Sequence, residues 1–266
     1  MTPQYARAIE DVWAGLSNWP MWTRLGWLDI KRRYRRTSIG PFWAASQVAT
    51  MVFSVGFLWA ALFGQPVSTY MPFLCSGLIV WLVFASFVNE GATVFTAAQP
   101  LLTSIRIPLT FLVVTMVWRN IIVFAHNLGV FVLVAIFWKV PITPQTLLFI
   151  PALFLLSLNG IWIGLLVGMI ATRLRDIPQL VGGLLQIMML LTPIMWSRST
   201  LSGHEAVSFL IDLNPLTHLI EVVRTPLLGG APPLLSWVVT AASVVIGGFG
   251  TLAVFSRFRQ RVPYWL

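Results

Sequence analysis

The sequence predicts an all-α integral membrane protein with about six transmembrane helices. Hydrophobic residues make up 58% of the 266 positions and charged residues only 9%, whereas a soluble domain is about one quarter charged. The apolar residues also form unbroken runs of roughly 20 residues, which is the length that crosses a bilayer as a helix. Strands of a membrane barrel would instead alternate in segments of about 10 residues. Helices are therefore expected.

The position of the basic residues predicts the orientation of these helices. Five basic residues lie within 31–36, before the first apolar run, and three arginines lie within 257–261, after the last. Arg106, Arg173 and Arg175 lie in turns that the same topology places on the same side. Cytoplasmic segments of membrane proteins carry such an excess of Lys and Arg. Both termini are therefore expected in the cytoplasm, and the net charge of +9 indicates topology rather than nucleic-acid binding.

In chain order, spans are expected at 41–63, 72–97, 109–138, 146–171, 178–197 and 234–255. Gly64-Gln65-Pro66 and Val140-Pro141 have the composition of turns between them. One transmembrane domain is expected to cover residues 1–266. It comprises a cytoplasmic interface segment (1–40), spans one to five (41–197), an outer segment (198–233), span six (234–255) and a cytoplasmic tail (256–266).

The interface segment is polar but contains four tryptophans. From Met21 onward, Trp22, Leu25 and Leu28 follow one another at three-residue steps, and basic residues lie between and after them. This pattern favours an amphipathic helix that lies in the plane of the membrane interface. A frayed N-terminal tail is the alternative.

The outer segment is apolar in patches that are too short to span a bilayer. Asn214-Pro215 and Gly229-Gly230 interrupt it. Two short helices that re-enter the outer leaflet fit this pattern, because non-spanning backbone at membrane depth must pack within protein or line a water-filled cavity. A plain folded outer loop is the alternative.

The sequence contains few candidates for catalysis. The only lysines, Lys31 and Lys139, do not follow the glycine that a phosphate-binding loop requires. Three scattered histidines and the single Cys75 predict neither a metal cluster nor an intrachain disulfide. We expect no catalytic residue, metal or cofactor in this chain, so that energy for any work comes from a partner or a gradient.

Two opposite charges lie inside predicted spans. Glu90 is about seven residues from the cytoplasmic end of span two, and Arg119 is about ten from the start of span three, so the two residues lie at similar depth. An unpaired charge in lipid would cost several kcal/mol, which favours an ion pair between adjacent helices. A role in transport is the alternative, although a proton relay would need more than one intramembrane carboxylate.

Four segments carry a family resemblance. They are DIKRRYRRTSIGPFW at 29–43, QPLLTSIRIP at 99–108, RLRDIP with LTPIMW at 173–178 and 191–196, and NPLTHLIEVVR at 214–224. In this order they resemble the permease subunit of type-2 ABC exporters, especially the branch that exports lipid-linked polysaccharides such as O-antigen, capsule or teichoic acid.

The resemblance implies two copies of the chain around a central pore in a bacterial inner membrane. It also implies two separate nucleotide-binding ATPase subunits, which hold the ATP and magnesium. In such permeases the N-terminal amphipathic helix and the first cytoplasmic turn contact the ATPase. The candidate coupling residues are therefore Pro100, Leu101, Ile105, Arg106 and Pro108. An ordinary helix turn is the alternative.

The implied substrate is a polysaccharide on a polyprenyl diphosphate. Arginine binds diphosphates through bidentate hydrogen bonds, so Arg33, Arg35 and Arg36 are candidates for the substrate headgroup; they could equally enforce orientation and bind anionic membrane lipid. Aromatic faces could grip a sugar chain weakly. The candidate channel aromatics are Phe42, Trp43, Phe53, Trp59 and Trp196, with a lipid-facing or core position as the alternative for each.

Three other functions are alternatives to this one. The same architecture could export a drug or a small lipid. A membrane enzyme acting on lipid-linked glycans would need a clustered acid, base or metal set, which the scattered His126, His204 and His218 do not supply. A proton-coupled flippase is disfavoured by the single intramembrane carboxylate.

Overall fold

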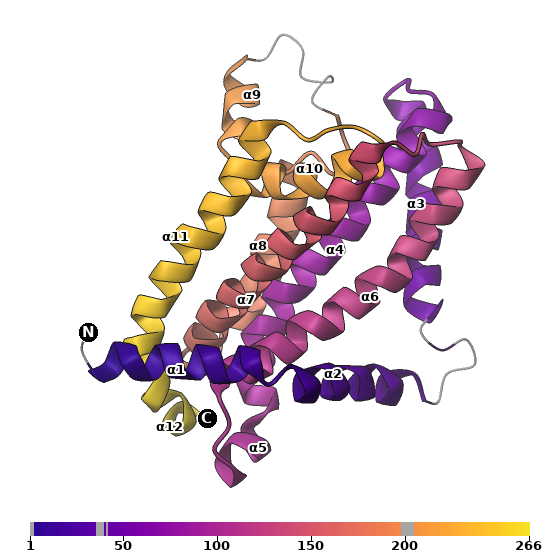
Figure 1. Ribbon diagram of the computed structural model, residues 1–266. Coiled ribbons are helices and arrows are strands. Elements are labelled where there is room, and N and C mark those ends of the chain that lie inside the picture. Colours follow the sequence, from indigo (N-terminus) through magenta and orange to yellow (C-terminus); the bar gives the residue numbers. More distant parts are fainter. Residues whose placement is uncertain (1–2, 36–39, 41, 198–204) are drawn as a thin grey trace.

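The computed structural model describes residues 3–35, 40, 42–197 and 205–266, and every regular element within these ranges is a helix (Figure 1). Five helices are long and apolar enough to cross a membrane. They are α3 (Phe42–Leu62), α4 (Val67–Ala97), α6 (Leu109–Phe137), α7 (Phe149–Arg173) and α11 (Leu234–Phe258). The prediction of an all-α integral membrane protein is confirmed.

The fifth predicted span is shorter than expected. Helix α8 (Ile177–Leu191) has 15 residues, which is about 22 Å at 1.5 Å per residue and less than the roughly 30 Å of a bilayer core. It ends because Thr192 adopts an extended conformation with ψ 138°, as expected for a residue that precedes a proline. The predicted span over 178–197 therefore overran the helix by several residues.

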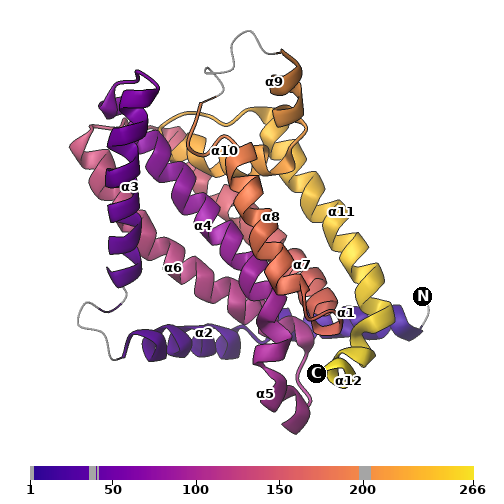
Figure 2. The same cartoon turned by 180° about the vertical axis from the view of Figure 1, so that it is seen from behind.

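Helix α4 is the centre of the bundle and packs against α3, α6, α7, α8 and α10 (Pro215–Leu227) (Figure 2). In the most apolar stretch of the span that contains α4, 72% of the residues are buried, whereas 17% are buried in the most apolar stretch of the span that contains α11. Glycines allow α7 to approach it closely: a Cβ on Gly91 would lie 2.9 Å from the Cα of Gly164. Gly160, Gly164 and Gly168 recur at every fourth position, a small-residue pattern typical of packed membrane helices.

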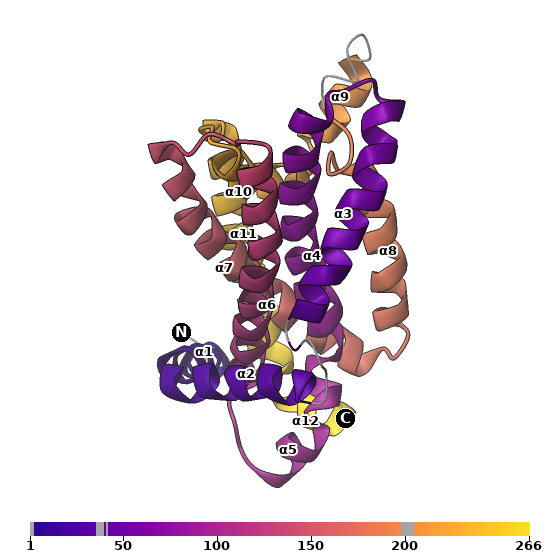
Figure 3. The ribbon, with the colours of Figure 1, turned by 90° about the vertical axis from the view of Figure 1, so that its right-hand side faces the viewer.

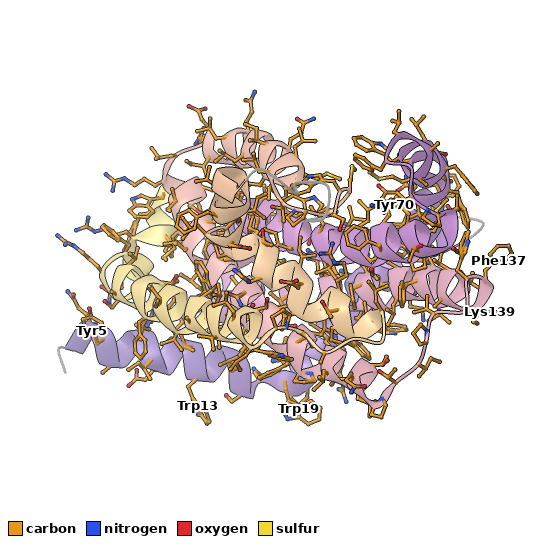
Figure 4. The ribbon with its side chains drawn as sticks, turned by 90° about the horizontal axis from the view of Figure 1, so that it is seen from above. Tyr5, Trp13, Trp19, Tyr70, Phe137 and Lys139 are labelled. Carbon is orange, nitrogen blue, oxygen red and sulfur yellow. The ribbon has the colours of Figure 1, made fainter. Side chains whose placement is uncertain are left out.

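Two helices lie across one end of the bundle, α1 (Pro3–Ser17) and α2 (Trp19–Tyr34) (Figures 1 and 3). Trp22 and Leu25 pack against the core, Ile30 is buried, and Leu28 is 45% exposed. Helix α2 lies against α6, where Gly26 meets Trp118. That α2 lies in the plane of the membrane interface stays a prediction. Trp13 and Trp19 point away from the bundle (Figure 4).

The opposite end carries α9 (Glu205–Asp212) and α10 (Pro215–Leu227), within the segment predicted to contain two short helices. Helix α10 packs against α4, α7 and α11. Its buried Arg224 donates a hydrogen bond from Nη1 to the Pro193 carbonyl at 2.7 Å, and its guanidinium lies 4.2 Å from the ring centre of Phe73. These contacts hold the segment after α8 against α4. Whether α10 lies within the outer leaflet stays a prediction.

The remaining elements are short. The 3₁₀ turn η1 (Pro144–Leu148) precedes α7, and α5 (Gln99–Ser104) joins α4 to α6. At the C-terminal end, η3 (Arg259–Arg261) and α12 (Val262–Trp265) follow α11. This end lies beside α5, where Gln99 Nε2 donates to the Leu266 carbonyl at 2.8 Å. The two termini of the chain thus lie at the same end of the bundle as α1 and α2 (Figure 3).

Candidate functional site: a charged cleft beside the exposed helix α5

A cleft of about 570 Å³ opens between α2, α4, α5 and α6. Three basic side chains line it, Arg32, Arg33 and Arg119, together with the carboxylates of Asp29 and Glu90. Asp29 and Arg33 are four residues apart on α2, which places them on the same face of that helix. The lining carries one more positive than negative charge, so the cleft favours an anion.

An ion-pair network crosses the cleft. Arg119 on α6 donates from Nη2 to Glu90 Oε2 at 2.6 Å and from Nη1 to Asp29 Oδ2 at 3.2 Å. Asn120 Nδ2 donates to the same Glu90 oxygen at 2.8 Å. Arg33 Nη2 lies 3.5 Å from Glu90 Oε1. The structure thus brings the predicted intramembrane pair together and adds two residues from α2, which join the interface helix to α4 and α6.

The network is only partly shielded from solvent. The side chains of Arg119 and Glu90 are 23% and 24% exposed, whereas that of Arg33 is 53% exposed. Arg119 has two carboxylate partners, but Arg33 makes one longer contact. Among the side chains of this network, Arg33 therefore loses the least interaction free energy when it turns toward a ligand.

Helix α5 forms one side of the cleft, and it projects from the bundle (Figures 1 and 2). None of its residues is buried. Pro100 and Leu101 line the charged cleft, while Ile105 and Arg106 line a second cleft of about 200 Å³ with Asp11 and Arg259. Pro108 directly precedes α6. The five predicted coupling residues thus occupy one exposed connection between two spans.

Asp11 on α1 fixes the start of α6. Its carboxylate accepts hydrogen bonds from the backbone N–H groups of Leu109 and Thr110 at 3.3 and 3.1 Å, and from the Thr110 hydroxyl at 3.0 Å. Pro108 supplies no side-chain cap of its own. A carboxylate at a helix N-terminus satisfies unpaired N–H groups and is favoured by the helix dipole. Arg259 Nε lies 3.4 Å from the same carboxylate, so this junction also includes the C-terminal segment.

The family model described as ABC-2 type transporter matches residues 22–228, which include α2, α5 and the charged cleft. The chain belongs to the ABC-2 type transporter family. It is thus the membrane-spanning subunit of a transporter. It is also 26% identical over 228 residues to the O-antigen export system permease protein RfbA of Myxococcus xanthus, and this alignment covers 82% of the chain and 85% of the relative.

The other predicted site residues of this ABC-2 chain lie outside the charged cleft. Arg35 is exposed at the end of α2 and lines a separate hollow of about 760 Å³ with Lys31 and Arg32. Arg36 lies outside the described residues. The structure therefore places Arg33, but not Arg35, with Glu90 and Arg119.

The predicted channel aromatics do not form a ring within one copy of the chain. Trp43 is 52% exposed on α3. Phe53 stacks on Phe57, and its ring centre lies 6.2 Å from that of Trp138. Trp59 packs against Phe63 at 5.1 Å between ring centres. Trp196 donates from Nε1 to the Leu190 carbonyl and closes the end of α8. The side chain of Phe42 is not among those described.

No site role was predicted for Asp29, which is only the first residue of the segment at 29–43, or for Asp11. Asp29 and Arg33 are four residues apart in the sequence, and this spacing indicates that they lie on the same face of a helix. The capping of α6 by Asp11 was harder to predict. Its one indication was that Pro108, at the start of α6, has no side chain that can cap the helix. Within the described residues, no group of three potential metal ligands is present.

Proposed function

We propose that this chain is the permease of an ATP-driven exporter that moves a lipid-linked polysaccharide, such as an O-antigen or a capsule, across the bacterial inner membrane. Two copies would enclose the pore, and two separate ATPase subunits would bind ATP and magnesium at the cytoplasmic end. The name of the relative supports the substrate class. The lack of a phosphate-binding loop in the sequence supports a separate ATPase.

One observation carries the proposal: the basic residues and the exposed helix α5 share a single cleft. Helix α5 follows α4 after one residue, Ala98, and leads through Pro108 into α6. Because Pro100 and Leu101 form part of the cleft wall, a displacement of α5 by an ATPase would move that wall. Nucleotide-driven motion would thus reach the place where an anionic headgroup binds.

The headgroup would bind through Arg32 and Arg33. A diphosphate offers bidentate acceptors that match a guanidinium, and an arginine with one longer carboxylate contact can exchange it for phosphate. Arg119 would stay bound to Asp29 and Glu90, which keeps the three helices together during this exchange.

The exposed face of α3 supports a pore between two copies. Trp43, Ser46, Gln47, Thr50 and Ser54 recur at helical spacing and line an open groove. Such polar side chains are disfavoured in contact with lipid tails, so this face is expected to line a water-filled cavity or meet another protein surface. A second copy of the chain would supply the facing protein surface and would enclose a water-filled cavity with it. In that cavity Trp43 could contact a passing sugar chain.

Co-expression with candidate ATPase subunits, taken from genes that neighbour the one for this chain, tests the class of transporter. A stable complex of two permeases and two ATPases with ATP hydrolysis is expected. Leu101→Asp and Ile105→Asp should each disrupt the complex, because they place a carboxylate in the proposed contact. Ile142→Asp is the matched control, since Ile142 is 91% exposed in the connection at the opposite end of the bundle. Equal disruption by all three variants, or an ATPase that never binds, would contradict the proposal.

Deletion of the chain followed by surface-glycan analysis tests the substrate. Loss of a long surface polysaccharide, with its lipid-linked precursor accumulating in the cell, is expected. Arg33→Gln should reduce export more than Arg24→Gln, because Arg24 is an exposed arginine of the same helix that does not line the cleft. An intact surface glycan with altered drug or lipid export would assign the transporter to the alternative class.

A further inference from the structure

Another cleft, separate from the two beside α5, lies between α7, α11 and α12, on the far side of the bundle from α3 (Figure 1). Its volume is about 320 Å³, and Met169, Ile170, Leu174 and Val254 supply an apolar lining. Phe258 and Trp265 form one end, with their ring centres 5.9 Å apart. The volume is within the range of small-molecule sites.

Three guanidinium groups surround this aromatic pair. Arg173 lies 5.6 Å from the ring centre of Trp265, and Arg257 and Arg261 lie 5.8 and 5.7 Å from that of Phe258. Among the residues that the structure describes, no carboxylate forms an ion pair with any of the three. Arg173 lines the cleft itself, and Arg257 and Arg261 lie beside the Phe258 ring that forms its end. Like charges near one aromatic pair repel one another, and an anion would relieve this repulsion.

The cleft also lies at the level expected for lipid headgroups. Phe258 directly precedes Arg259, which pairs with Asp11 of the interface helix α1. From this level the lining extends along α7 from Arg173 to Met169 and along α11 from Phe258 to Val254, about one helical turn on each. The charged end is thus beside the interface helices, and the apolar part continues along the spans.

We infer that this cleft binds one acidic phospholipid. Its phosphate would lie between Arg173, Arg257 and Arg261, and part of an acyl chain would lie against Ile170, Leu174 and Val254. Arginine suits a phosphate through bidentate hydrogen bonds, and interfacial basic residues attract anionic lipids. The site would hold the C-terminal segment against α7, at the same end of the bundle as α5.

Lipid retention by the purified full-length chain tests this inference. The chain in neutral detergent is titrated with short-chain phosphatidylglycerol or phosphatidylcholine, and bound lipid is counted by native mass spectrometry. Binding of one phosphatidylglycerol is expected, with phosphatidylcholine markedly weaker. Arg173→Gln should weaken phosphatidylglycerol binding about fivefold, which corresponds to about 1 kcal/mol for one interfacial arginine.

Arg175→Gln is the matched control, because Arg175 lies in the same turn and does not line the cleft. It should leave the affinity unchanged. Arg173→Lys keeps the charge and should retain most of the binding, which separates loss of the site from loss of folding. Equal affinity for both lipids, or equal losses in Arg173→Gln and Arg175→Gln, would overturn the inference.

A cleft-filling variant distinguishes a lipid from a soluble phosphate. Ile170→Trp should weaken phosphatidylglycerol binding while the melting temperature without lipid stays unchanged, because Ile170 is 39% exposed and room exists around it. Glycerol 3-phosphate should compete poorly. If it competes as well as phosphatidylglycerol, the cleft is a site for phosphate and not for a lipid.

Discussion

Replacing Glu90 by glutamine tests whether its carboxylate holds the bundle together or carries a proton. The carboxylate accepts hydrogen bonds from Arg119 and Asn120 and lies 3.5 Å from Arg33. Glutamine keeps the size of the side chain but removes the charge, which leaves Asp29 as the carboxylate partner of Arg119.

The expected loss of stability follows from the exposure of the network. Breaking a fully buried pair costs about 3–5 kcal/mol, whereas an exposed pair contributes about 0–1 kcal/mol. Because the Glu90 and Arg119 side chains are about one quarter exposed, we expect a loss of about 2 kcal/mol. For a chain of this size that lowers the melting temperature by about 4–8 °C.

The assay is thermal unfolding in detergent, followed by fluorescence-detected size exclusion, with transport measured on the assembled complex. Glu10→Gln is the control, because Glu10 is an exposed carboxylate of α1. In a double-mutant cycle with Arg119→Gln, the two losses should not add, with a coupling of about 1–2 kcal/mol. An unchanged melting temperature together with abolished transport would refute the structural reasoning and assign Glu90 to proton transfer.

Three further outcomes follow from the packing. Asp11→Asn should lower the free energy of unfolding by about 1–2 kcal/mol, because the start of α6 loses a charged cap; an unchanged denaturation midpoint would contradict the capping role. Gly91→Ala should destabilise by about 1–3 kcal/mol, since its Cβ would lie 2.9 Å from Gly164, whereas Gly248→Ala, with open space around it, should not. Cys75 is completely buried in α4, so its thiol should react with maleimide only after denaturation, and rapid labelling of the native chain would show that α4 is accessible.

Much of the candidate site was predictable residue by residue. Glu90 and Arg119 were expected to pair because each alone would be costly in a span, and the exposed connection over 99–108 was expected from its place between two apolar runs. Their meeting with Arg33 in one cleft was not predicted. It depends on the angle at which α2 crosses α4 and α6, and no periodicity along α2 specifies that angle.

The sequence by itself determined the class, the order of the spans and the location of the connections. These depend on the length of apolar runs and on prolines and glycines, which act through the local backbone. The tertiary structure alone decided that Asp11 caps α6 and that three arginines from α7, α11 and η3 lie around one aromatic pair. Each of these features joins residues far apart in the chain, and their energies exist only once the helices have packed.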